Sequence, residues 1–228
     1  MPADVLAALV GTDPGVPRLT WYDDGAGERI ELSAAVLANW VAKAANLLQD
    51  DADAGPGTRV RVALPPHWRA VYWALATWSV GGTVVVGSAE RPSDVLVGWD
   101  PEETGTHDGY AVHVTLAALA RSNPETPPGV VDEARELATY GDRFEAYAQA
   151  SPEDPALSAD GAVTAYRDLV EARDWPARPR VRVVGDLDRV LRDSLAAWAL
   201  GGSVVLIARP GSDESARLAA ERVTVDLA

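Results

Sequence analysis

The sequence contains no cysteine and only three histidines, at positions 67, 107 and 113. Without thiols, the chain cannot form a disulfide scaffold, a cysteine nucleophile or an iron–sulfur site, and the scattered histidines exclude a zinc finger. Lysine is also scarce, because Lys43 is the only lysine among 20 basic residues. The chain can therefore offer very few lysine-based sites.

The motifs that mark common enzyme sites are missing as well. The sequence has no Gly-x-Ser-x-Gly elbow, no His-Glu-x-x-His pair, no Gly-x-Gly-x-x-Gly turn and no Walker A loop. Acidic pairs such as Glu102 and Glu103 are expected by chance among 34 acidic residues. We therefore assign no catalytic, cofactor-binding or metal-binding residue and predict no cofactor, and the substrate-binding residues stay unknown at this point.

The overall composition is that of a folded, acidic protein. The 228 residues are 47% hydrophobic and carry a net charge of −14, and a chain of this length buries roughly 70% of its unfolded surface. The negative charge repels phosphate backbones and anionic membranes, so we predict neither as a partner. Asp4 stands where a secretory signal needs a positive charge, which favours a cytoplasmic protein.

An uncharged stretch from Ala70 to Ala89 has the length of a membrane-spanning helix. Its composition argues against a membrane-spanning helix, because the pair Gly81 and Gly82 interrupts the stretch and four Ser or Thr residues lower its hydrophobicity. The stretch instead predicts a buried helix and a buried strand joined by a tight turn.

Hydrophobic periodicity predicts a strand–helix–strand unit near the N-terminus. A hairpin over residues 18–32 comes first, and an amphipathic helix over 34–48 then follows Ser33 as its N-cap. Residues 58–64 alternate as a strand does, and the double proline after them suits the start of a helix over 67–80. A strand over 83–86 completes the unit, which is typical of a parallel sheet with a right-handed crossover.

The same unit recurs about 120 residues later. Arg59–Val62 matches Arg180–Val183, and the pattern from Leu75 to Val85 matches that from Leu195 to Val205. Each glycine pair follows a helix and precedes a strand, so it predicts a helix C-cap and not a phosphate loop. The repeat predicts two similar subdomains packed together as one unit, the first over residues 1–150 and the second, shorter one over 151–228.

The order of these elements resembles the N-terminal region of the adenylate-forming (AMP-binding) superfamily, which includes acyl-CoA synthetases and nonribosomal adenylation domains. The segments that carry the resemblance are Gly55–Val60, Leu64–Pro66, Gly81–Val86, Pro152–Ala156 and Ala162–Val170. The match is best to short actinobacterial relatives of these enzymes. It implies two three-layer α/β/α subdomains with largely parallel sheets, without the family's β-barrel and C-terminal domain.

The departures from the family pattern bear on function. Between Leu157 and Ala162 the family would place a Ser/Thr/Gly-rich loop ending in lysine, which holds the ATP phosphates. This chain has only Ser-Ala-Asp-Gly there, and we predict that Asp160 and Gly161 form a tight hairpin turn. Lys43 is expected to be solvated on the first helix, where it cannot replace either family lysine.

The resemblance therefore predicts a truncated, degenerate, non-catalytic relative, a pseudoenzyme that acts as a binding or assembly module. Its partner would be a protein of unknown identity, and the oligomeric state is not predicted. Two alternatives stay open. The chain could be one part of a split acyl-adenylating enzyme completed by another polypeptide, or a small-ligand-binding protein with a cleft between the subdomains.

Overall fold

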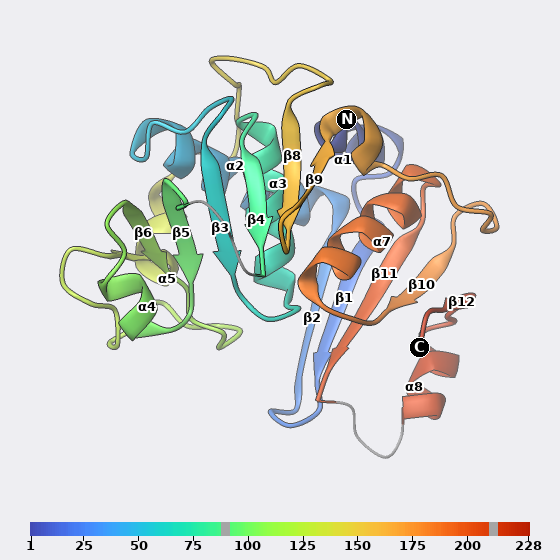
Figure 1. The fold of residues 1–228 in the computed structure, drawn as a ribbon. Coiled ribbons are helices and arrows are strands. Elements are labelled where there is room, and N and C mark those ends of the chain that lie inside the picture. The colour runs from blue at the N-terminus through green and yellow to red at the C-terminus, as the bar shows by residue number, and fades with distance from the viewer. Residues whose placement is uncertain (88–91, 210–213) are drawn as a thin grey trace. The chain divides into compact units, whose positions relative to one another are not determined.

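The computed structural model describes residues 1–87, 92–209 and 214–228. The fold is mixed α/β, as predicted, with two largely parallel sheets (Figure 1). The chain separates into two units, each of which contains one sheet. Unit 1 comprises Met1–Ala38, Pro65–Val71 and Val170–Ala228, and unit 2 comprises Asn39–Leu64 and Tyr72–Leu169.

Unit 2 contains a seven-stranded sheet in the order β7-β6-β5-β3-β4-β8-β9, in which only β8 and β9 are antiparallel neighbours. Its strands are β3 (Arg59–Ala63), β4 (Thr83–Val86), β5 (Val95–Gly98), β6 (Tyr110–His113), β7 (Val131–Asp132), β8 (Pro155–Ala159) and β9 (Ala162–Ala165). Its short helices are α4 (Pro101–Gly105), α5 (Glu133–Glu136), the 3₁₀ helix η1 (Leu137–Thr139) and α6 (Tyr166–Leu169).

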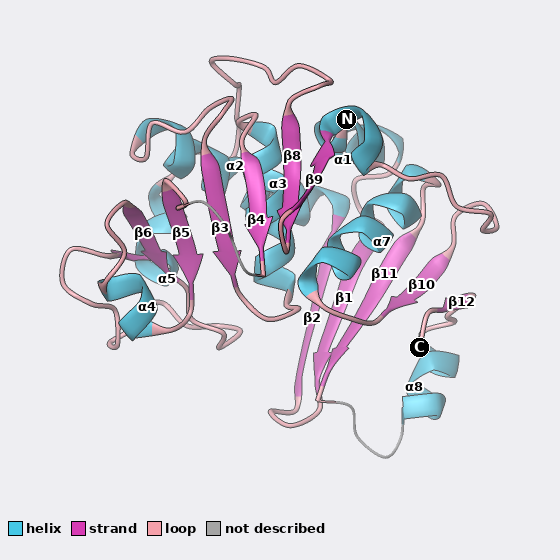
Figure 2. Ribbon diagram, in the orientation of Figure 1, coloured by secondary structure: helices cyan, strands magenta, loops and turns pink. Residues whose placement is uncertain are grey.

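Unit 1 contains a five-stranded sheet in the order β12-β10-β11-β1-β2, and again only the hairpin pair β1–β2 is antiparallel. Helix α7 packs against β10 and β11, and α1 packs against α7 (Figure 2). The elements of unit 1 are α1 (Pro2–Thr12), β1 (Pro17–Asp23), β2 (Glu28–Ser33), β10 (Arg180–Val183), α7 (Leu187–Ala199), β11 (Ser203–Ala208), α8 (Glu214–Ala220) and β12 (Val225–Asp226). The division between the units passes through α2 (Ala34–Asp50) and α3 (Trp68–Ser79).

The repeated strand–helix–strand units form as the sequence predicts. All four residues of β4 are buried, and α3 is apolar enough that Trp73, Ala74 and Ala76 have no exposed surface. The uncharged stretch is therefore a buried helix followed by a buried strand, although its last two residues, 88 and 89, lie outside the described residues. In the described parts of the chain, no helix combines the length and apolar composition needed to cross a bilayer.

Caps fix the ends of the main helices. The Ser33 hydroxyl accepts the Val36 N–H at 3.2 Å, which confirms the predicted N-cap of α2. The Asp186 carboxylate caps α7 in the same way and accepts the Arg189 N–H at 3.0 Å. At the other ends, Gly81 and Gly201 adopt φ values of +85° and +71°. This left-handed conformation ends each helix and turns the chain into the next strand, which confirms that the glycine pairs are C-caps.

The repeat extends further than the sequence comparison indicates, because the two hairpins are also equivalent. Leu157 of β8 pairs with Val84, and Leu19 of β1 pairs with Val204, which is the repeat counterpart of Val84. Both hairpins shift register just after their first proline. Two buried indoles then bind equivalent carbonyls. Trp78 donates to Ala156 O at 2.7 Å, and Trp198 donates to Arg18 O at 2.9 Å.

The strand pairing divides the chain differently from the predicted boundary at residue 150. The N-terminal hairpin β1–β2 joins the sheet of β10, β11 and β12, whereas the hairpin β8–β9 joins the sheet of β3 and β4. Each sheet thus combines a hairpin from one half of the sequence with a strand–helix–strand unit from the other. The internal repeat shows which segments are alike, but backbone hydrogen bonding decides which of them pair.

The regions without a repeat are less predictable. The many Gly, Thr and Pro residues over 100–129 predict irregular structure around a short element near residues 110–121, whereas this segment contains α4 and β6. The segment 130–137, whose sequence is compatible with either a helix or a strand, holds both β7 and α5. Helix α1 and strand β5 have no counterpart among the predicted elements. Strand β5 has four residues and α4 has five, and elements so short give little periodic signal.

Gly202 provides a test of the close packing at the end of α7. A methyl group added there would collide with the carbonyl oxygen of Pro179, and Gly202→Ala should therefore lower the free energy of unfolding by about 2 kcal/mol. The matched control is Gly11→Ala in α1, where nothing lies within 4 Å of the added methyl group and a gain of about 0.5 kcal/mol is expected. Urea unfolding followed by circular dichroism measures both, and equal stabilities of the two variants would contradict the packing described.

Candidate functional site

The segment where the family resemblance places a phosphate loop is a closed hairpin. Asp160 and Gly161 have φ values of +45° and +85°, and Ala159 pairs with Ala162 directly across them. Two central residues with positive φ are typical of a type I′ turn, which suits the twist of the flanking strands. The predicted tight turn is confirmed.

This turn does not fit the phosphates of a nucleotide. A phosphate cradle needs several free backbone N–H groups that converge on one point, usually in front of a helix. Here the chain turns within two residues and returns as β9. The Asp160 carboxylate also lies against Gly87, where an added Cβ would be 2.5 Å from Oδ1. The Asp160 side chain therefore occupies space where β4 and β8 end, the edge at which parallel sheets usually bind ligands.

Lys43 is not the solvated residue that the sequence predicts. It is half-buried on α2, and its Nζ donates to the carbonyl oxygens of Tyr140, at 2.5 Å, and Ala138, at 3.4 Å. The ammonium group thus binds the backbone at the end of η1, where carbonyls without helical partners are good acceptors. Lys43 therefore has a structural role in unit 2, and among the described residues its hydrogen bonds go to these carbonyls and not to the β8–β9 turn.

The two units satisfy the carbonyls at the end of their long helix in different ways. In unit 2 the buried phenol of Tyr166 donates to Gly82 O at 2.7 Å. The hairpin registers make Ala34 the counterpart of Tyr166 in unit 1, where no phenol is available. There, Arg18 Nη1 donates to Gly201 O at 2.6 Å and to Gly202 O at 3.1 Å.

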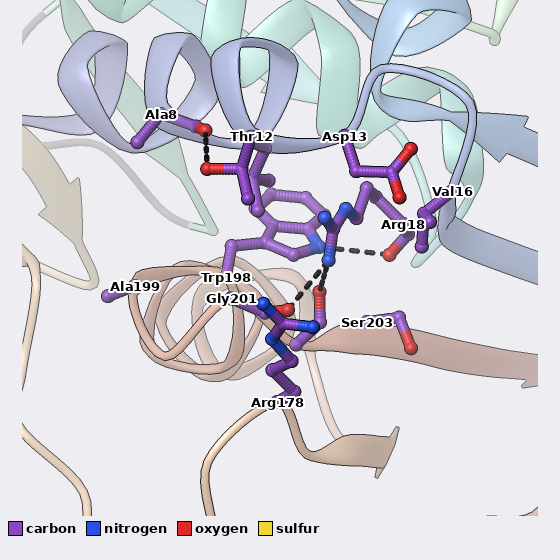
Figure 3. A pocket seen from close by; sticks show the side chains of 12 residues that line it. Ala8, Thr12, Asp13, Val16, Arg18, Arg178, Trp198, Ala199, Gly201 and Ser203 are labelled. Atoms are coloured by element: carbon purple, nitrogen blue, oxygen red, sulfur yellow. Dashed lines mark hydrogen bonds between the residues drawn. The ribbon is translucent and has the colours of Figure 1, made fainter.

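A pocket of about 390 Å³ lies beside Arg18 in unit 1 (Figure 3). Its wall combines the last turns of α1, the start of β1, the segment before β10, and the junction of α7 and β11. The residues that line it are Ala8, Leu9, Thr12, Asp13, Val16, Arg18, Arg178, Trp198, Ala199, Gly201, Gly202 and Ser203. It is a concave, partly apolar site with a few polar groups, which is typical of small-molecule pockets.

The charge of this pocket is positive. Arg18 is only 6% exposed, and the guanidinium groups of Arg18 and Arg178 point toward one another (Figure 3). Burial is the main cause that lowers the pKa of Arg18, the charge of Arg178 lowers it further, and Asp13 acts in the opposite direction. Since arginine stays protonated in proteins, burying Arg18 beside a second positive charge is unfavourable, and a bound anion would offset this electrostatic cost.

A second hollow of about 510 Å³ in unit 1 is lined mainly by charged residues that neutralise one another. Asp193 binds Arg173 at 3.1 Å and Arg189 at 3.4 Å, and Asp188 binds Arg192 at 2.8 Å. These ion pairs use the charges that a ligand would need. The pocket beside Arg18 is therefore the stronger candidate site.

Sequence reasoning does not identify Arg18 or Arg178. A usable signal exists for Arg18, because the hairpins align Pro17 and Leu19 with Pro155 and Leu157, so that Arg18 takes the place of Ala156. A repeat that replaces a small buried residue with arginine indicates a specific role. Arg178 has no such signal, since the loop before β10 is not part of the repeat.

Comparison with known proteins identifies the family. A scan against models of protein families gives no match. A TIGR03089 family protein of Mycobacterium tuberculosis is 34% identical over 244 residues, which cover 96% of this chain and 95% of that protein. The chain belongs to the TIGR03089 family.

Solved structures show which fold this TIGR03089 family chain has. It resembles a Brucella canis acyl-CoA synthetase with a TM-score of 0.77 and 14% identity, and the match covers 97% of this chain and 45% of that structure. It also resembles the acetoacetyl-CoA synthetase of Streptomyces lividans with a TM-score of 0.74 and 19% identity, and this match covers 99% of this chain and 42% of that structure. A third match is the N-terminal domain of FACL13 from Mycobacterium tuberculosis, with a TM-score of 0.70 and 14% identity, and it covers 99% of this chain and 62% of that structure. The predicted α/β fold of adenylate-forming enzymes is confirmed, and the chain spans 42 to 62% of these structures.

Tyr166 gives a pH-dependent test of the helix-end contacts. Tyr166→Phe removes the bond to Gly82 O and should lower the free energy of unfolding by about 1 kcal/mol. Burial, followed by the charge of Asp154, raises the pKa of Tyr166 above 10.0. The stability gained by keeping this phenol neutral is present below pH 10 and is lost as the pH rises toward the folded-state pKa, because only the unfolded chain ionises there.

Urea unfolding from pH 8 to 11.5 measures this effect, and the Tyr166→Phe variant should lose less stability above pH 10 than the unchanged chain. The control is Tyr147→Phe, since the Tyr147 side chain is 82% exposed and its phenol donates to Asp50 at the surface, at 3.1 Å. Its removal should change the stability and the pH dependence much less than Tyr166→Phe does. Identical pH profiles for all three proteins would contradict the assigned contact.

Proposed function

We propose that this chain is a non-catalytic acyl-CoA synthetase-like protein that acts as a binding or assembly module. The closed turn at Asp160 and Gly161 is the observation that carries this proposal. It replaces an open anion cradle with a two-residue hairpin and places a carboxylate at the carboxyl ends of β4 and β8. The fold around it is intact, so the change affects the chemistry of this edge and not the scaffold.

The energetic effect on nucleotide binding is large. A cradle supplies three or four charge-assisted hydrogen bonds to phosphate, each worth ~1.5 to 3 kcal/mol. Losing them removes ~5 to 10 kcal/mol, or ~4 to 7 decades of affinity for ATP.

Mg-ATP binding to the full chain tests the proposal by isothermal titration calorimetry, together with an adenylate-formation assay on a panel of carboxylic acids. We expect no binding at micromolar ATP and no adenylate, while an acyl-CoA synthetase run in parallel shows both. Micromolar binding with adenylate formed from any acid would overturn the proposal.

The variant Asp160→Asn separates geometry from charge. Asparagine followed by glycine favours the same type I′ turn, so the hairpin persists while the carboxylate charge is removed. We expect this variant to bind no Mg-ATP either, because the free N–H groups of a cradle are still absent. Micromolar binding by Asp160→Asn would show that the closed turn does not exclude nucleotides.

The alternative of a split acyl-adenylating enzyme requires a second polypeptide that contributes the phosphate contacts. The same assay repeated with the proteins that co-purify from the native host distinguishes it. Adenylate formed only in the presence of a co-purified partner would replace the non-catalytic assignment with the split-enzyme one.

A further inference from the structure

The pocket beside Arg18 combines a buried cation with unused hydrogen-bonding capacity. Arg18 uses Nη1 for the carbonyl oxygens of Gly201 and Gly202, whereas its Nε has no acceptor among the described residues. A guanidinium group has five N–H donors in a fixed planar fork. Several of these donors therefore remain for a ligand, in a side chain that is more than nine-tenths buried.

A second arginine faces the same space. Arg178 lines the pocket, and among the described residues its guanidinium group has no hydrogen-bond or ion-pair partner (Figure 3). Its backbone adopts a φ of +52°, which is unfavourable for a residue with a Cβ. Burial is the main cause that lowers the pKa of Arg18, and the repulsion from the Arg178 guanidinium adds to it.

Asp13 is the acidic residue among those described in the pocket wall. It attracts Arg18 through space but forms no direct ion pair with it in the described part of the chain. The local charge is therefore positive in a chain whose net charge is −14. The two arginines therefore attract an anion into the pocket, and the Asp13 carboxylate weakens this attraction.

The rest of the wall is largely apolar, with Leu9, Val16 and the Trp198 indole among its members. A volume of about 390 Å³ exceeds what an inorganic ion requires and falls in the range of small organic ligands. Guanidinium forks bind carboxylates and phosphates in a bidentate manner. We propose that this pocket binds a small organic oxyanion, with its carboxylate or phosphate head between Arg18 and Arg178 and its apolar body against Leu9 and Trp198.

This proposal does not rest on the proposed function, because all the lining residues belong to unit 1 and none belongs to the β8–β9 turn. It also differs from a site for ATP phosphates, which would need a nest of backbone N–H groups. The pocket instead offers side-chain cations and an apolar wall.

Isothermal titration calorimetry of the full chain tests the proposal with four probes: octanoate, octyl phosphate, octanol and inorganic phosphate. We expect at least one of the two octyl anions to bind at least tenfold more tightly than octanol and than inorganic phosphate. Which anion is preferred identifies the head group. Equal binding of octanol and both octyl anions, or no binding of either anion, would overturn the proposal.

Arg178→Gly is the decisive variant, because glycine suits the positive φ at this position and the fold should be retained. We expect it to weaken binding of the preferred octyl anion at least tenfold. Arg222→Gly is its matched control, since Arg222 also has a positive φ, of +53°, and is exposed outside the pocket. Equal loss in both variants, or no loss in Arg178→Gly, would contradict the assigned site.

Asp13→Asn provides a test in the opposite direction. Removing this carboxylate eliminates the repulsion of the bound anion, so the preferred octyl anion should bind about threefold to tenfold more tightly, with octanol unaffected. Weaker binding of the anion by this variant would contradict the charge assignment. If the full chain binds Mg-ATP and Arg178→Gly binds it equally well, that result contradicts the proposed function but not the proposed anion pocket.

Discussion

The parallel pairing of each hairpin with a strand from the other half of the sequence is the constraint on which the rest of the structure depends. It joins Leu19 to Val204 in one sheet and Leu157 to Val84 in the other. The indole bonds of Trp78 and Trp198 lie at these junctions, and each ties a long helix to the first residues of the hairpin strand. The C-capping glycines allow each helix to turn directly into the strand that the hairpin joins.

Equivalent scaffolds have acquired different local chemistry in the two units. The carbonyl of Gly82 is satisfied by a neutral phenol, and that of Gly202 by a guanidinium group. A phenol fills the space it occupies, whereas Arg18, which has partners among the described residues for only one of its nitrogens, leaves donors unused. The candidate pocket is thus a consequence of one difference between the repeats. Unit 2 uses Tyr166 to bind the carbonyl at the helix end, whereas unit 1 uses Arg18, which lies at a different position of the hairpin.

Much of the fold follows from the sequence, because amphipathic helices and half-buried strands have clear periods and the glycine pairs mark where helices end. The boundaries of β4 are predicted to the residue, and Asp160 followed by Gly161 indicates a type I′ turn by its composition alone. Strand pairing across the two halves is not predicted, since periodicity carries no information on which edges meet. The pocket is not predicted either, because it depends on where the Arg18 and Arg178 side chains converge from segments that are far apart in sequence.

The exchange of hairpins also affects how the chain reaches its native state on the ribosome. Arg18 and its partner Trp198 are 180 positions apart, and synthesis proceeds at about 5 to 20 residues per second. The first hairpin therefore waits on the order of ten to forty seconds before its partner strand exists. During that interval its long edge is open to pairing with other chains, so the yield of native protein should depend on how fast β11 is translated and on chaperones that cover β1 until then.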